Sequence, residues 1–281
     1  MNRFYSLAAL SLVFCLVGAG CSSSSPSAKS SGPQPAAFTG LSPKDAALKV
    51  NLVSPDVIVV HQSFSGQGAQ IAEELGWGDA ATTTVTIQQF APENSASFEW
   101  LRDTEVASGT QMAPMQATGT IASIDLLKSH SVTSPSYWQK GDYQATGSGI
   151  LWLSQYAFDD LTKAKSGTFS FDFVEPDFIG SVKTPTFTKA ITALNASVKA
   201  TIDHTDVYLA KADDPSVMTV KLNGVDTKVQ AVTAHTWFGS FTFLDNPSNP
   251  LVLQLTTDPK VMGDLSSFFD FQVTELQGLT Q

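Results

Sequence analysis

The residues that can carry out acid–base or nucleophilic chemistry are few in this chain and lie far apart. No two of its four histidines stand within five residues of each other: His61, His130, His204 and His235. This spacing lacks the paired histidines of common zinc motifs, and the chain has no G-x-S-x-G nucleophile elbow. In His61-Gln62-Ser63 a base and a hydroxyl share one face of a strand. A hydrolase with a non-local active site therefore remains the alternative to a non-catalytic protein.

A polar and aromatic cluster is the most suggestive candidate for binding. Tyr137, Trp138 and Tyr143 stand close together in a turn-rich segment that also contains hydrogen-bonding side chains. Such rings are typical of faces that stack on sugars or contact a partner protein. Aromatic rings beside a sheet also commonly form the edge of a core. We predict a binding face at these three residues, with core packing as the alternative, and we predict no cofactor and no metal.

Charge and cysteine content exclude several function classes. The chain has 16 Lys and Arg against 26 Asp and Glu, for a net charge of −10, which argues against nucleic acid as a partner. Its two cysteines, Cys15 and Cys21, both stand near the N-terminus. The remainder of the chain thus has no disulfide, no thiolate nucleophile and no cysteine ligand for zinc.

The N-terminal residues have the pattern of an export signal. Arg3 precedes an apolar run over residues 7–17, which is too short to cross a bilayer as a permanent helix. The small residues before Cys21 resemble the lipobox of bacterial lipoproteins, although Gly18 stands where that family usually has leucine. The resemblance implies that the signal peptide 1–20 is removed and that Cys21 is acylated. The alternative is an ordinary secretory signal cut before a free Cys21 thiol.

The segment after Cys21 is expected to be a tether. Residues 21–40 are rich in serine and proline and have little apolar bulk with which to fold. In the lipoproteins that the chain resembles, an aspartate directly after the cysteine favours the inner membrane in some bacteria, and here the residue is Ser22. The resemblance therefore implies an outer-membrane lipoprotein of the cell envelope. Its partners would be the membrane, through the lipid anchor, and an envelope protein or a glycan.

The elements that must position any site are mostly strands. Period-two or continuous apolar patterns predict strands over residues 57–60, 84–88, 97–101, 119–127, 149–153, 168–173, 198–202, 207–209, 218–222, 225–232, 237–243, 251–253 and 269–273. Asn223-Gly224 predicts a type I′ hairpin turn. Ser42 and Ser154 are expected to begin helices, a short helix is expected over 68–76, and residues 107–116 are expected to form a loop.

This pattern predicts a mainly β fold, either an antiparallel β-sandwich or a barrel-like body, with a few short helices after a disordered N-terminal tether. The β-rich domain would span residues 41–281, with a possible domain boundary near 175–185. Taken together, the sequence predicts a lipid-anchored envelope protein whose body binds or scaffolds without catalysis.

Overall fold

The computed structural model describes residues 38–74, 77–78, 80–108, 111–138, 140–171 and 209–279. The predicted signal peptide, Cys21 and nearly all of the linker lie outside these ranges, as do the expected strand 198–202 and the possible boundary near 175–185. The described residues all belong to one compact unit, Ala36–Gln281.

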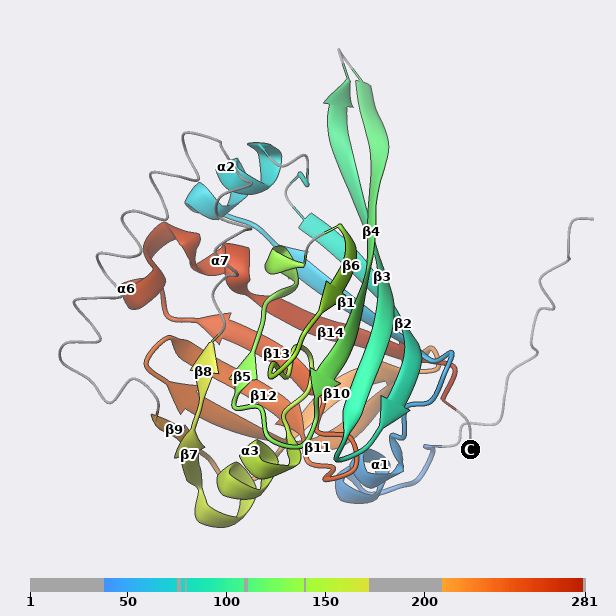
Figure 1. Ribbon diagram of the computed structural model, residues 1–281, viewed down its shortest axis with the longest axis vertical. Helices are drawn as coiled ribbons and strands as arrows, with labels where there is room; N and C mark the ends of the chain where they lie inside the picture. The colour runs from blue at the N-terminus through green and yellow to red at the C-terminus, as the bar shows by residue number, and fades with distance from the viewer. Residues whose placement is uncertain are drawn as a thin grey trace, which may run out of the picture. The chain divides into compact units, whose positions relative to one another are not determined.

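Strands dominate the described body, and 12 of them form one sheet whose neighbours are mostly antiparallel (Figure 1). They are β1 (Val57–Ser63), β2 (Ala80–Ala91), β3 (Ser95–Ser108), β4 (Gln111–Asp125), β6 (Gly141–Gln144), β7 (Ser166–Thr168), β9 (Leu209–Ala212), β10 (Ser216–Leu222), β11 (Val225–Thr236), β12 (Gly239–Leu244), β13 (Val252–Thr257) and β14 (Phe271–Gln277). A separate pair joins β5 (Ser131–Val132) and β8 (Ser170–Phe171). The mainly β, barrel-like fold class is confirmed.

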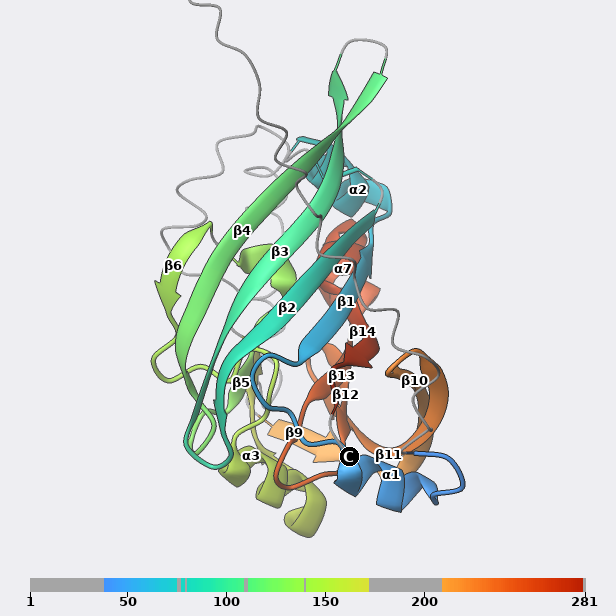
Figure 2. The ribbon, with the colours of Figure 1, turned by 90° about the vertical axis from the view of Figure 1, so that its right-hand side faces the viewer.

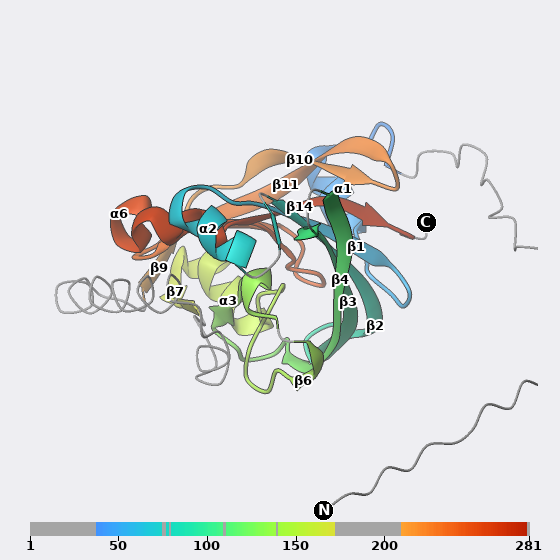
Figure 3. The same ribbon diagram turned by 90° about the horizontal axis from the view of Figure 1, so that it is seen from above.

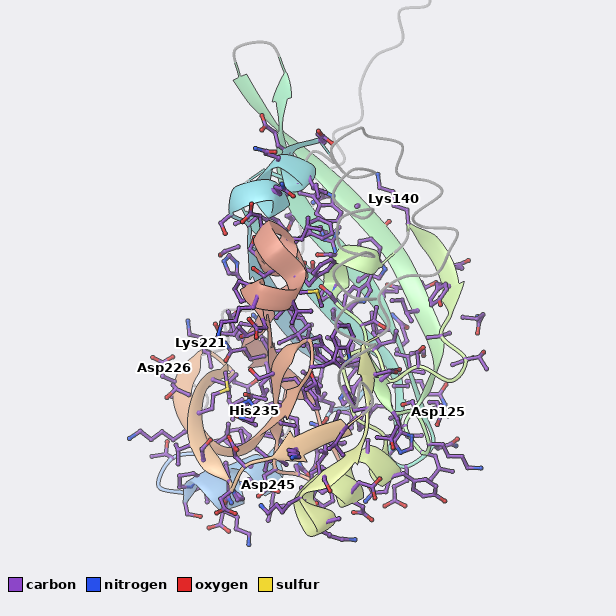
Figure 4. All side chains as sticks on the ribbon, turned by 90° about the vertical axis from the view of Figure 1, so that its left-hand side faces the viewer. Asp125, Lys140, Lys221, Asp226, His235 and Asp245 are labelled. Atoms are coloured by element: carbon purple, nitrogen blue, oxygen red, sulfur yellow. The ribbon has the colours of Figure 1, made fainter. Side chains whose placement is uncertain are left out.

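The C-terminal strands close on themselves. β11 pairs with β12, β12 with β13, β13 with β14, β14 with β10, and β10 with β11, and we call these five strands the ring. The predicted hairpin is present, with φ of 49° at Asn223 and 83° at Gly224. Both residue types tolerate positive φ, which the tight turn requires. Figure 4 shows the exposed side chains of Lys221 and Asp226 on this hairpin.

The N-terminal strands form a long curved layer, which we call the wall: β6, β4, β3, β2 and β1 in that order, with β1 joined to the ring through β14 (Figure 2). β3 and β4 pair as far as Ser108↔Gln111 and project beyond the body as a two-stranded ribbon. The expected loop over 107–116 is therefore wrong. A hairpin ladder continues through small and polar residues because its hydrogen bonds are made by the backbone.

Besides strands β5 to β8, residues 126–171 contain the 3-10 helix η1 (Pro135–Tyr137), the helix α3 (Gln155–Asp159) and the π-helical turn η2 (Asp160–Ala164). Seen from above, β2, β3 and β4 lie on one side of α3, and β10 and β11 lie on another (Figure 3). Ser154 caps α3 as predicted, since its Oγ accepts from Ala157 N at 3.2 Å. The helical turns end at Lys165, where φ is 58°, two residues before the expected Gly167.

The expected strand over 149–153 is wrong. These residues form a turn in which Trp152 N donates to Gly149 O at 2.9 Å, with one bridge from Trp152 to Leu251. Ile150 has a φ of 51°, which interrupts an extended backbone. A Cβ at Gly149 would lie 2.6 Å from the carbonyl oxygen of Ser131, so the glycine allows a close backbone approach. Residues 149–153 are apolar because they are buried. A short, continuous apolar stretch does not by itself distinguish a strand from a buried turn.

Short helices cover the ends of the sheet. α1 (Pro43–Lys49) begins at Ser42 as predicted, and α2 (Gly66–Glu74) matches the second expected helix. α6 (Pro259–Met262), the 3-10 helix η3 (Gly263–Leu265) and α7 (Ser266–Phe269) were not expected, and they take Phe269 out of the predicted closing strand. Among the helices in the described ranges, none is long and apolar enough to span a membrane.

Candidate functional site

One charged side chain is buried in the wall. Phe98, Trp100 and Arg102 alternate along β3 and all face inward, with 1 to 2% of each side chain exposed. Arg102 is the only arginine in the chain after Arg3, because every other cation is a lysine. The lysines in the described ranges are exposed or only partly buried, so this chain buries a single cation there, and it is a guanidinium.

The guanidinium of Arg102 lies against two indole rings. Its central carbon is 4.3 Å from the ring centroid of Trp77 and 5.4 Å from that of Trp100, which is cation–π geometry. Nε donates to Thr83 Oγ1 at 3.2 Å, and Nη2 donates to the carbonyl oxygen of Pro135 in η1. These partners are neutral, and in the described part of the chain no carboxylate forms an ion pair with Arg102.

Burial lowers the pKa of Arg102 to about 9, well below the ordinary value for arginine, because removal from water disfavours the charged form. The side chain is therefore still a cation at neutral pH. Each pKa unit corresponds to about 1.4 kcal/mol, so holding this charge in the core carries a substantial free-energy cost. Cation–π contact and two neutral acceptors offset part of that cost.

Buried polar atoms without partners lie on the segments that pack around this cation. Gln62 Nε2 donates to Ser136 Oγ at 2.8 Å and to Asp270 O at 3.2 Å, but Gln62 Oε1 is buried without a hydrogen bond. The indole nitrogens of Trp100 and Trp138 are also buried and unpaired. Because such atoms cost free energy, a concentration of them is a candidate site. The Arg102 cluster consists of Gln62, Trp77, Thr83, Trp100, Arg102 and Trp138.

Aromatic rings enclose the cluster. Trp138 contacts Phe98 at a centroid distance of 5.1 Å and Trp100 at 6.1 Å. Trp77 stacks on Phe268 of α7 at 5.5 Å with an interplanar angle of 3°. Of the three indoles in the cluster, Trp77 is the most exposed, at 9% against 2% for Trp100 and 5% for Trp138. Trp77 is therefore the ring nearest to solvent.

The structure describes the side chains of two of the three residues of the predicted aromatic face. Trp138 is buried and belongs to the Arg102 cluster, while Tyr143 in β6 is partly buried and packs against the core. Tyr137 ends η1, and its side chain lies outside the description. A binding role for the three residues stays a prediction. Trp138 would take part in it from within the core.

The structure brings His61 and Ser63 together, as their spacing suggested. His61 Nε2 lies 3.1 Å from Ser63 Oγ at the end of β1. Within the described ranges, no carboxylate hydrogen-bonds to the imidazole. A base–hydroxyl pair is therefore present without the acid that orients the base in a triad.

The other histidines lie elsewhere. His130 is 3.9 Å from Asp160, exposed His235 is 2.9 Å from Asp213, and His204 lies outside the described residues. In the residues that the structure describes, no group of three or more His, Cys, Asp or Glu side chains is placed to hold a metal ion.

Sequence reasoning missed Arg102, although the signal was present. The expected strand over 97–101 stopped one residue short, and extending its alternation by one position places Arg102 on the inward face with Phe98 and Trp100. An arginine on a core-facing position, in a chain whose other body cations are lysines, marks a buried charge.

Comparison with known proteins found no matching family model, no similar curated protein and no similar solved structure.

Proposed function

We propose that this chain is a lipid-anchored cell-envelope protein whose β-rich body binds or scaffolds without catalysis. The observation that carries the non-catalytic part is the chemistry of the Arg102 cluster. A guanidinium that stays protonated at neutral pH is neither a nucleophile nor a general base, whereas its N–H groups recognise other molecules. The hydroxyl of Thr83 and the indole N–H groups of Trp100 and Trp138 can likewise form hydrogen bonds, and the indole rings provide apolar contact area.

The anchor is supported by the N-terminal sequence. Acylation of Cys21 uses a thiol that would otherwise be exposed to oxidation in an exported protein. Each acyl methylene contributes about 0.8 kcal/mol to membrane attachment, so two or three chains hold a protein on a membrane. The net charge of −10 gives no electrostatic attraction to an anionic membrane, which leaves the lipid as the means of attachment. We place the protein at the outer membrane of the cell envelope.

Mass spectrometry of the mature N-terminus tests the anchor. We expect an N-terminal Cys21 that carries acyl chains, and we expect Cys21→Ala to shift the protein from the membrane to the soluble fraction. Cys15→Ala is the matched control, because that cysteine lies in the apolar part of the predicted signal peptide. An unmodified Cys21 thiol, or equal membrane association of both variants, would refute the anchor.

Cross-linking in intact cells followed by purification from membranes tests the binding role. We expect a specific envelope protein or glycan to co-purify with the wild-type chain. If the protein purifies alone at every cross-linker dose and binds no small molecule, the binding role is wrong.

The hydrolase alternative is favoured by one contact, the 3.1 Å distance between His61 Nε2 and Ser63 Oγ. A fluorophosphonate probe, which labels activated serines, tests it. Labelling that Ser63→Ala abolishes and Ser65→Ala keeps would establish the hydrolase, since both serines are exposed and only Ser63 contacts His61. We expect neither residue to be labelled.

A further inference from the structure

We infer that the Arg102 cluster is a binding site for a carboxylate monoanion joined to an apolar body. This inference rests on the proposed non-catalytic binding role and names the ligand class that the site would take. The guanidinium of Arg102 is buried and is held by Thr83, Pro135 and two indole rings.

A purely structural role does not account for the cluster. Burying a cation without a counter-charge costs free energy that an apolar side chain of similar length avoids. In the described body, Arg102 has no carboxylate partner, and Gln62 Oε1 and two indole N–H groups lie nearby without partners. Features that cost stability and are retained in one place are typical of binding sites.

The charge and shape of the guanidinium favour a carboxylate. Its planar fork of N–H donors matches two carboxylate oxygens, and one cation neutralises one negative charge. A phosphate monoester carries about −1.5 to −2 charges near neutral pH, so it would leave surplus negative charge in the core. The unpaired Nε1–H groups of Trp100 and Trp138 are further donors that suit an anion.

The surroundings of the cation favour an apolar body on that carboxylate. The ring of Trp138 lies 5.1 Å from that of Phe98 and 6.1 Å from that of Trp100, between ring centroids. The rings of Phe64, Trp77 and Phe268 lie within 6.1 Å of one another. A polar body would lose its hydration among these rings without regaining hydrogen bonds. An alkyl or aryl group gains contact area there.

The most exposed ring of the cluster shows where the anion would approach. Trp77 lies 4.3 Å from the guanidinium carbon and is 9% exposed, so it separates Arg102 from solvent. A carboxylate that pairs with Arg102 from this side must displace the Trp77 ring. Binding should therefore change the indole fluorescence of the protein.

The test titrates the full-length mature chain, in the detergent used to extract it, with two carboxylates and their uncharged matches. The probes are octanoate against 1-octanol and phenylacetate against 2-phenylethanol. We expect saturable binding of at least one carboxylate, seen by calorimetry and by a change in tryptophan fluorescence, and at least tenfold weaker binding of its alcohol. Bound carboxylate should also raise the Tm.

Substitution of the cation localises the binding. Arg102→Met keeps most of the side-chain volume and should weaken carboxylate binding at least tenfold, to the level of the alcohol. Lys128→Met is the matched control, because it removes an exposed cation at the other end of the wall, and it should bind like the wild type. Trp100→Phe keeps an aromatic ring but removes the unpaired N–H donor and part of the ring beside the guanidinium, so it should fold and weaken binding several-fold. It keeps the test decisive if Arg102→Met does not fold.

Three results would overturn the inference: no saturable binding of either carboxylate to the wild type, equal affinity for carboxylate and alcohol, or wild-type affinity in both Arg102→Met and Trp100→Phe. These results leave the proposed function testable on its own. A protein that binds neither carboxylate yet captures an envelope partner refutes this site and keeps the binding role.

Discussion

Two groups of buried polar side chains lie in the same body, and they differ in how their hydrogen bonds are satisfied. Beside the ring, Trp152 Nε1 donates to Asn249 Oδ1 at 3.0 Å, and Asn249 Nδ2 donates to Val50 O at 3.1 Å. Asn246 Nδ2 donates to Ala47 O and Val50 O, at 3.0 and 2.9 Å. In the Arg102 cluster, by contrast, Gln62, Trp100 and Trp138 each keep a buried polar atom without a partner.

This difference separates a structural network from a binding site. The network of Trp152, Asn246 and Asn249, which we call the Asn249 network, ties the C-terminal end of α1 and the loop before β13 to the turn at residues 149–153. Its polar groups face one another, so it contributes stability and specifies one packing arrangement. The Arg102 cluster has hydrogen-bonding capacity left over, which only another molecule can use.

The largest effect is expected from breaking the Asn249 network. Asn249→Ala removes the acceptor of Trp152 Nε1 and the donor to Val50 O, and it leaves a buried indole N–H unpaired. We expect a loss of about 3 kcal/mol in the free energy of unfolding, or roughly 6–12 °C in Tm. Urea denaturation measures it. Ser248→Ala in the same loop is exposed and should change stability by less than about 0.5 kcal/mol. Equal stability of the two variants would contradict the structural role.

A matched pair of tryptophan substitutions sharpens the comparison. Trp152 and Trp138 are both buried, yet only the indole N–H of Trp152 has an acceptor. Changing either to Phe removes similar ring volume, but Trp152→Phe also leaves Asn249 Oδ1 without a donor. We therefore expect Trp152→Phe to lose about 1–2 kcal/mol more than Trp138→Phe in denaturation. If Trp138→Phe is the more damaging change, its N–H has a structural role.

Much of the fold could be predicted from the sequence wherever one pattern dominated locally. Asn223-Gly224 predicted the hairpin, and Ser42 and Ser154 predicted two helix starts, because the turn and cap chemistry of these residues is local. The ribbon over 107–116 and the turn at Gly149 were mispredicted. In the ribbon, backbone pairing with the partner strand determines the extended conformation. At Gly149, the close approach of the Ser131 backbone determines the turn.

The candidate site was less predictable than the fold. Trp138 was singled out for its neighbours in sequence, whereas its site partners Gln62 and Trp77 come from distant positions. Which polar atoms remain unpaired depends on packing between those segments, and no sequence period encodes it. Only the inward register of Arg102 was available from the sequence.

The pH dependence of stability provides a further test of the buried charge. The pKa of Arg102 is lowered to about 9 in the folded state, so between that value and the higher, ordinary pKa of arginine the unfolded state binds more protons. The wild type should therefore gain stability relative to Arg102→Met as the pH rises above about 9, by about 1 kcal/mol over the first pH unit. Chemical denaturation of both proteins from neutral to alkaline pH measures this difference in stability. Both proteins contain the same lysines and tyrosines, so the contribution of those side chains cancels in the difference. A constant difference would show that Arg102 is not desolvated.

The smallest effect is expected from Asp270, the carboxyl group next to the cluster, whose backbone oxygen accepts from Gln62. Burial raises the pKa of Asp270, and hydrogen bonds to Oδ1 from Thr257 N at 2.7 Å and Thr257 Oγ1 at 2.9 Å only partly oppose that shift. A carboxyl whose folded pKa is raised contributes stability that is fully present below the unfolded value of 3.8 and is lost as the pH rises through the folded pKa.

Denaturation of the wild type and of Asp270→Asn across acidic pH tests this sign. We expect the stability of the wild type relative to the variant to fall as the pH rises from below 3.8 through the raised pKa, because the amide of the variant has no acidic proton to lose. If wild-type stability instead rises relative to Asp270→Asn over this interval, the Thr257 hydrogen bonds outweigh burial, and Asp270 resembles the satisfied Asn249 network more closely than the Arg102 cluster beside it.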